Sequence, residues 1–221
     1  MAEAYMGANR EYKSSVFSLL FGEENTLRRL YEALEGVTLP ADLPITINTL
    51  EDALFKTRIN DISFEAGEKL VVILEHQSTV SPNMPLRLLS YIARIYEKIT
   101  AGKRRWYGKK GFKIPRPEFI VLYNGVEPFP EEETFRLSDA FEDVSSLGLS
   151  AAAAPPDLEL TARVYNINEG HNRDMVQKDE TLSGYVMFIA KVREFESGLT
   201  GGKKPGDVSR DERKGIMKTA I

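Results

Sequence analysis

Two hydrophobic periods alternate along the chain, and together they predict a protein that mixes helices with strands. Apolar side chains at spacings of three and four are typical of helices with one buried face. This spacing is found in residues 12–21, 25–35, 84–100 and 181–197. Short runs rich in Val, Ile and Leu are typical of strands. Such runs occupy residues 45–50, 70–74, 117–124 and 158–167. We therefore predict an α/β fold with a central sheet flanked by helices.

The most regular apolar run, residues 70–74, ends abruptly in polar residues. Leu, Val and Ile fill every position of the run, which predicts a strand buried on both faces. Glu75, His76 and Gln77 follow it directly. A carboxylate at the end of a buried strand is costly to desolvate unless a cation or a hydrogen-bond donor compensates it. Glu75 is therefore the first candidate for a functional residue.

A second carboxylate, Asp61, precedes this strand by a length that suits a hairpin. With the turn at residues 65–69, Asp61 lies opposite Ile73 and diagonal to Glu75, about 7 to 8 Å away at Cα. Two carboxylates at this separation need a shared cation, and Mg²⁺ takes one or two carboxylates together with waters and phosphate oxygens. The plainer interpretation is that Asp61 closes a strand or turn and that Glu75 is merely exposed at a strand end.

Length and composition indicate one main domain. With 221 residues, of which 42% are hydrophobic, the chain is long enough to bury one core, which we assign to residues 1–197. We predict that residues 198–221 form a linker and the start of a truncated C-terminal helical segment. No apolar run approaches 18 residues and no signal peptide is evident, so we expect a cytoplasmic protein without a membrane partner. The chain has no cysteine, which excludes disulfides and zinc–thiolate sites.

The net charge of −4 argues against nucleic-acid binding through the overall field of the protein, so any such binding must be local. Residues 98–113 hold seven basic residues, no acidic residue and the only tryptophan. Lys and Arg contact phosphates, and an aromatic ring can stack on an unpaired base. The candidate contacts are Lys103, Arg104, Arg105, Trp106, Lys109 and Lys110. A solvated loop with Trp106 packed onto the body is the alternative.

The helix predicted over residues 84–100 carries a polar stripe opposite its apolar face. The stripe comprises Arg87, Tyr91, Arg94 and Lys98, at spacings of four, three and four. It is either a solvated helix face or a phosphate-binding surface. Because the helix begins soon after Glu75, we rank Arg87 first as a phosphate contact.

Several sequence blocks, in this order, resemble the recombination-promoting nuclease family. They are NREYKSSVFSLLFGEENTLRRLYEAL, LEDALF, NDISF, LEHQSTVSPNMPLRLLSYIARIYEKI and FIVLYNG, which together span roughly residues 9–197. The succession of an Asp, a turn, an apolar strand and Glu-x-Gln is similar to the PD-(D/E)XK nuclease motif. In this resemblance Asp61 is the Asp, and Glu75-His76-Gln77 stands for the (D/E)-x-K element.

The resemblance implies a restriction-endonuclease-like fold, with a mixed central sheet, and a DNA endonuclease of low sequence specificity. Asp61, Glu75 and the backbone carbonyl of His76 would bind Mg²⁺, with Mn²⁺ as an alternative ion. Gln77 stands where the superfamily usually has Lys; it can donate and accept hydrogen bonds but brings no charge. The narrower family commonly carries this Gln. The implied biology is recombination or mobile elements.

Two other classes of function fit the same sequence. A protein with this fold that binds nucleic acid without cleaving it is expected if Gln77 cannot replace Lys. A structural or regulatory interaction protein that binds no nucleic acid agrees with the acidic net charge. The sequence leaves the oligomeric state open, including a homo-oligomer.

Overall fold

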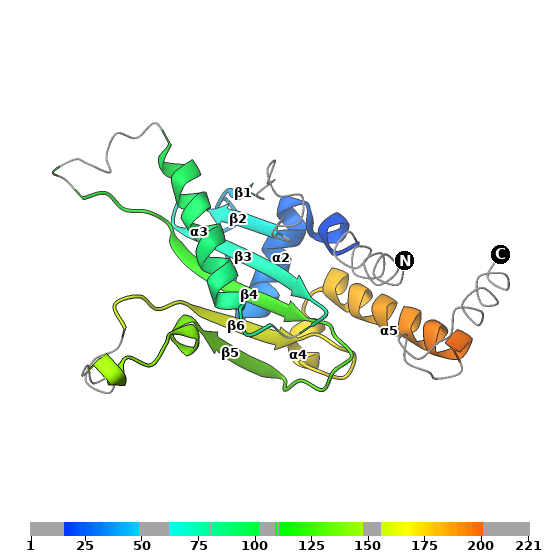
Figure 1. Cartoon of the computed structure of the whole chain (residues 1–221). Helices are drawn as coiled ribbons and strands as arrows, with labels where there is room; N and C mark the ends of the chain where they lie inside the picture. The colour runs from blue at the N-terminus through cyan, green and yellow to red at the C-terminus, as the bar shows by residue number, and fades with distance from the viewer. Residues whose placement is uncertain are drawn as a thin grey trace.

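The computed structural model describes residues 16–48, 62–79, 81–101, 109, 111–147 and 156–200. A mixed six-stranded sheet forms the centre, with helix α3 on one face and helices α2 and α5 on the other (Figure 1). The predicted α/β fold with a sheet flanked by helices is therefore confirmed. Within the described ranges, no helix combines the length and the apolar character needed to cross a membrane.

The sheet has the strand order β1-β2-β3-β4-β6-β5. Strands β1, β2 and β3 form an antiparallel meander, β3, β4 and β6 are parallel, and β5 pairs antiparallel with β6 at the edge. The strands are β1 (Ile45–Ile47), β2 (Ile62–Ala66), β3 (Leu70–Gln77), β4 (Arg116–Tyr123), β5 (Glu132–Arg136) and β6 (Thr161–Asn166). The carboxyl ends of three parallel strands thus meet at one edge of the sheet.

The helices agree closely with the hydrophobic periodicity. Residues 16–21 are helical, and they fall within the first predicted helix. Further along the described chain, the helices are α2 (Glu24–Glu35), α3 (Met84–Thr100), α4 (Arg173–Val176) and α5 (Glu180–Thr200). Gly36 ends α2 in the left-handed conformation, with φ of 64°. Helix α5 continues to Thr200, which is three residues into the segment predicted as a linker.

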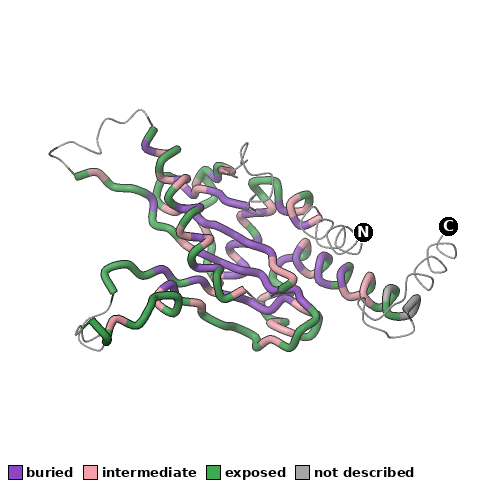
Figure 2. The backbone as a smooth tube through the Cα atoms, in the orientation of Figure 1, coloured by how far each residue is buried: buried purple, intermediate pink, exposed green. Residues whose placement is uncertain are grey.

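Two apolar cores lie on opposite faces of the sheet, and β3 contributes to both. Val71 and Ile73 pack in the core beneath α3, whereas Val72 and Leu74 pack in the core beneath α2 and α5. Figure 2 shows the resulting buried stretch along the central strands. The prediction that residues 70–74 form a strand buried on both faces is confirmed.

The predicted hairpin register between β2 and β3 is wrong by two residues. Ser63, not Asp61, pairs with Ile73, and Ala66 pairs with Leu70. The turn is tighter than predicted because Gly67 and Glu68 both adopt positive φ, 56° and 55°. Two successive left-handed residues reverse the chain within three positions, so residues that the sequence analysis placed in the turn belong to the strands.

The predicted polar stripe on α3 is also partly wrong. Tyr91 is only 3% exposed and belongs to the core beneath α3. The short 3-10 helix η1 (Leu137–Ala140) and strand β5 pack against α3 in addition to the central strands. This contact widens the buried arc of the helix beyond the stripe of Leu and Ile that the sequence displays.

Strand β5 and helix α4 were not predicted. Four of the five residues of β5 are exposed, because the strand lies at the edge of the sheet. An exposed edge strand needs no alternation of apolar and polar residues, so its sequence, EETFR, carries no strand signal. A second short 3-10 helix, η2 (Ser145–Leu147), follows η1.

A charged network fastens α2 to the start of the parallel strands. Arg163 of β6 donates to Glu35 at 2.6 Å and to Glu118 of β4 at 3.2 Å. The hydroxyl of Tyr31 donates to the same oxygen of Glu118 at 2.9 Å. Burial raises the pKa of Tyr31 well above its ordinary value, and the hydrogen bond and charge of Glu118 raise this pKa further.

We expect Tyr31→Phe to change the alkaline stability of the protein. At pH 8 the variant should unfold with about 1 kcal/mol less free energy, because one hydrogen bond is lost. Because the pKa of Tyr31 is raised in the folded protein, only the unfolded wild type releases this proton above the ordinary tyrosine pKa of about 10. The free energy of unfolding of the wild type therefore falls by up to about 1.4 kcal/mol per pH unit in this range. The deficit of the variant should therefore disappear by about pH 11.

Urea unfolding of both proteins between pH 8 and 11.5 measures this difference. Burial also raises the pKa values of Tyr96, Tyr123 and Tyr165, but these groups are present in both proteins and cancel in the comparison. Two stability curves that stay parallel over the whole range would contradict the prediction.

Candidate functional site

Glu75 lies near the carboxyl end of β3, a central strand of the sheet, and pairs with Val121 of β4. Side chains alternate along a strand, so Glu75 shares the face of Ile73 and Val71, beneath α3. Glu75 is only 1% exposed. The sequence interpretation that it is merely an exposed residue at a strand end is therefore wrong, and its charge needs compensation.

Arg87 and Gln77 both donate to the same oxygen of Glu75. Arg87 Nη2 lies 3.1 Å from Glu75 Oε2, and Gln77 Nε2 lies 3.3 Å from that oxygen. Arg87 comes from the second turn of α3, whose first turn follows β3 after a short loop. Its guanidinium lies 6.0 Å from the ring centroid of Tyr91 and donates to the Tyr91 hydroxyl at 3.4 Å. The burial of Tyr91, which departs from the predicted stripe, thus helps to position Arg87.

The charge of Glu75 is thus compensated by a residue that reaches the protein surface. Arg87 supplies the compensating charge, and its side chain is 39% exposed, so it can leave without opening the core. A hard metal ion would compete with the guanidinium for the carboxylate oxygen. Across the described part of the chain, no group of three or more acidic, His or Cys side chains is close enough to hold a metal ion.

His76 faces the other side of the sheet from Glu75. Its Nε2 lies 2.8 Å from the hydroxyl of Tyr185 on α5, and its ring stacks on Phe17 at a centroid distance of 5.2 Å. His76 is 7% exposed. The imidazole is therefore part of the core beneath α5, and only the backbone carbonyl of His76 remains a candidate metal ligand next to Glu75.

Several predicted site residues lie outside the described residues. These are Asp61, Lys103, Arg104, Arg105, Trp106 and Lys110. Lys109 is described and exposed. The basic loop begins after α3 ends at Thr100, whereas Arg87 is near the start of that helix. At about 1.5 Å per residue, the helix separates Arg87 from its own end by about 20 Å. The structure thus brings together Glu75, Gln77 and Arg87.

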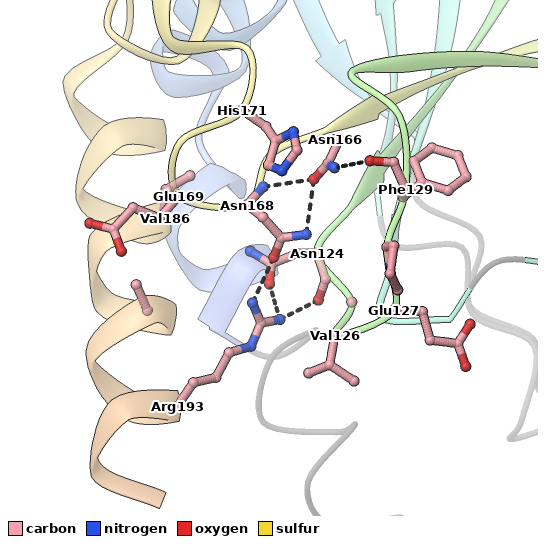
Figure 3. A pocket seen from close by; sticks show the side chains of 13 residues that line it. Asn124, Val126, Glu127, Phe129, Asn166, Asn168, Glu169, His171, Val186 and Arg193 are labelled. Atoms are coloured by element: carbon pink, nitrogen blue, oxygen red, sulfur yellow. Dashed lines mark hydrogen bonds between the residues drawn. The ribbon is translucent and has the colours of Figure 1, made fainter. Parts of the chain in front are cut away.

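A polar pocket that was not predicted from the sequence lies at the carboxyl ends of β4 and β6 (Figure 3). It has a volume of about 460 Å³ and is formed by the β4–β5 loop, the β6–α4 loop and α5. Arg193 of α5 donates to the carbonyl of Asn124 and to Asn168 Oδ1, both at 2.6 Å. Asn166 Oδ1 accepts from the side chain of Asn168 at 2.9 Å.

One sequence signal could have pointed to this pocket. Two parallel strands end in the same pair, Tyr123-Asn124 and Tyr165-Asn166, and both asparagines are buried. A buried amide at a strand end needs hydrogen-bond partners, as a buried carboxylate does. Asn-Gly is also a turn signal, so the sequence of Asn124 and Gly125 equally predicts a turn. Arg193 carries no comparable signal, because its partner Asn124 lies 69 residues earlier in the chain.

Comparison with known proteins adds no family and no structural relative. No family model, no curated protein and no solved structure matches this chain.

Proposed function

We propose that this protein is a Mg²⁺-dependent endonuclease that hydrolyses DNA phosphodiesters, with a restriction-endonuclease-like fold and its active site at the end of β3. The observation that carries the proposal is the environment of Glu75. A carboxylate that is 1% exposed, in the middle of a sheet, accepts hydrogen bonds from an amide and a removable guanidinium. An apolar residue at this position would cost less than a compensated carboxylate, so the presence of Glu75 favours a role in binding or catalysis.

In the proposed mechanism, Asp61, Glu75 and the carbonyl of His76 would hold the metal ion. When bound there, the ion would supply Lewis-acid chemistry, making a water more acidic and polarising the phosphodiester. Gln77 orients the attacking water through its amide, which lies 3.3 Å from Glu75 Oε2. Arg87 neutralises Glu75 before the ion binds and contacts a phosphate oxygen afterwards, since its five donors suit either acceptor.

The observed register between β2 and β3 indicates where the second proposed carboxylate, Asp61, would have to lie. In β2 and β3, Ile62 pairs with Leu74, and these residues are the chain neighbours of Asp61 and Glu75. The proposal requires this register to continue by one residue, which would set Asp61 directly opposite Glu75. Directly opposed residues of antiparallel strands have Cβ atoms about 4.5–5.5 Å apart, a spacing at which two carboxylates can share one ion.

DNA binding in this proposal is local, because the net charge of the chain is −4. Arg87 and the basic loop, with Lys103, Arg104, Arg105, Trp106, Lys109 and Lys110, supply the contacts. The length of α3 between Arg87 and the loop, about 20 Å, corresponds to about six base pairs at 3.4 Å each. The loop would therefore hold the duplex away from the cleaved bond.

A second candidate function is DNA binding without cleavage. It is favoured by the ion pair of Arg87 with Glu75 at 3.1 Å, which supplies a protein cation where a metal would bind, and by Gln77 in the position of the usual Lys. A metal ion must displace this contact to reach Glu75 Oε2.

One experiment separates these functions. Purified protein is incubated with supercoiled plasmid in Mg²⁺, Mn²⁺ or EDTA, and cleavage and mobility shift are measured on parallel gels. We expect nicked and linear products with either metal ion and none in EDTA. A shift without products would support the second candidate, and neither products nor shift would overturn both.

A further inference from the structure

The pocket contains a polar network that holds the side-chain amide of Asn124 by its oxygen. Arg193 donates to the backbone carbonyl of Asn124 at 2.6 Å and also to its side-chain oxygen Oδ1. Because a guanidinium only donates, these contacts identify the Asn124 oxygen and so fix which way its amide nitrogen faces. The orientation of Asn124 Nδ2 is therefore set by the protein itself.

The side-chain amide nitrogen of Asn124 makes no hydrogen bond to a described residue. No described residue accepts a hydrogen bond from Asn124 Nδ2, whereas the side-chain amide nitrogens of Asn166, Asn168 and Asn172 all donate to described acceptors. Asn124 is 1% exposed and lines the pocket. An unused donor on a buried side chain that lines a pocket indicates a ligand with a hydrogen-bond acceptor.

The charges around the pocket argue against a phosphate as that ligand. Glu127 and Glu169 line the pocket together with Arg193, so carboxylates outnumber the guanidinium. His171 also lines it, and its Nδ1 lies 3.0 Å from the carboxylate of Glu131. A neutral group avoids the repulsion that two carboxylates would impose on an anion.

The shape and remaining walls fit a neutral ring. The volume of about 460 Å³ lies within the range of about 300–1,000 Å³ for small-molecule sites. Val126, Val186 and Ala190 give the pocket apolar walls. A ring with acceptors on one edge and amino donors on another could accept from Asn124 Nδ2 and donate to Glu127 or Glu169, which is the hydrogen-bonding pattern of a nucleobase.

We propose that this pocket binds one unpaired nucleobase of a nucleic-acid strand, with Asn124 Nδ2 donating to an acceptor on the base. This proposal deepens the proposed nuclease function and rests on it, because the nucleic-acid strand that supplies the base is the proposed nuclease substrate. Asn124 N donates to the carbonyl of Gln77 at 2.8 Å, so the pocket wall is bonded to the carboxyl end of β3, with the pocket beside α5 and the side chain of Glu75 beneath α3. A strand cleaved at Glu75 would pass this edge of the sheet, so a base held in the pocket makes the protein favour DNA that has an unpaired nucleotide.

The test uses Asn124→Asp, which keeps the oxygen that Arg193 contacts and replaces only the donor nitrogen with a second acceptor. Fluorescence anisotropy in EDTA measures the affinity for three labelled duplexes: fully paired, with one unpaired nucleotide, and with an abasic residue at the unpaired position. We expect the wild type to bind the duplex with the unpaired nucleotide about 10-fold more tightly than the other two. In Asn124→Asp this preference should fall to about 2-fold or less, with unchanged affinity for the paired duplex.

Asn25→Asp is the matched control, because it makes the same charge change at an exposed position of α2. It should keep the wild-type preference, and the melting temperatures of both variants should stay close to that of the wild type. The base-binding proposal would be overturned if the wild type bound the three duplexes equally, or if its preference survived in Asn124→Asp. Either result would leave the nuclease proposal intact. Absence of binding to every duplex would overturn both, and an Asn124-dependent preference without plasmid cleavage would overturn only the nuclease.

Discussion

Replacing Glu75 with Gln is expected to lower the DNA-cleavage rate about 1,000-fold or more, equivalent to about 4 kcal/mol of transition-state stabilisation. The neutral amide cannot hold a metal ion as a carboxylate does, so the proposed metal site loses a charged ligand. The fold should survive. Gln has the same shape, it can still accept from Arg87, and the change removes a buried charge that is costly to desolvate. We expect the free energy of unfolding to change by about 1 kcal/mol or less.

Mg²⁺ itself provides a second measurement on the same variant. An ion that binds only the folded protein stabilises it by about 2.7 kcal/mol at 100 times its dissociation constant. Mg²⁺ should therefore raise the melting temperature of the wild type and change that of Glu75→Gln little or not at all. Wild-type cleavage by the variant, or an equal Mg²⁺ effect in both proteins, would contradict the site.

Glu118→Gln is the matched control for this prediction. Glu118 is also a carboxylate of a central strand that pairs with an arginine, Arg163, at 3.2 Å. It lies near the start of β4, at the opposite end of the sheet from Glu75, which pairs with Val121 further along the same strand. The variant should be less stable but should cleave DNA at nearly the wild-type rate. A comparable loss of cleavage would mean that the effect reports folding and not metal binding.

The sequence predicted those parts of the fold that are determined by burial. The apolar periodicity of residues 84–100 matches the bounds of α3, and the unbroken apolar run of β3 correctly indicated a strand with a core on each face. The need of Glu75 for a compensating partner could be predicted for the same reason, since a carboxylate directly after such a run is costly to desolvate. These features depend on local sequence and on the general cost of exposing apolar surface.

The features that the sequence did not predict depend on long-range packing or on local backbone choices. The register of β2 with β3 was misplaced because Glu68, a residue with no preference for positive φ, adopts a φ of 55°. Tyr91 is buried because η1 and β5 pack on α3. The pocket joins Asn124 to Arg193 across 69 residues, and no local pattern encodes that contact.

Replacing Gln77 tests how the attacking water is oriented. Gln77 Nε2 lies 3.3 Å from Glu75 Oε2, which places an uncharged donor where the PD-(D/E)XK motif of the proposal would have a lysine. If Gln77 only orients water, Gln77→Ala should lower the cleavage rate about 100-fold, as removal of a group that positions a reactant does. The Mg²⁺-dependent stabilisation should be retained, because the amide is not among the proposed metal ligands.

Gln77→Lys distinguishes orientation from charge at the same position. The lysine ammonium has three donors and can approach both Glu75 and the water, and its charge favours the hydroxide form of that water. We therefore expect single-turnover cleavage at saturating Mg²⁺ to be at least as fast as in the wild type. A variant as slow as Gln77→Ala would mean that the ammonium pairs with Glu75 and excludes the metal ion, which weaker Mg²⁺ stabilisation would reveal. Full activity in Gln77→Ala would instead remove Gln77 from the mechanism, and the water would then have to be oriented by the metal ion or by Arg87.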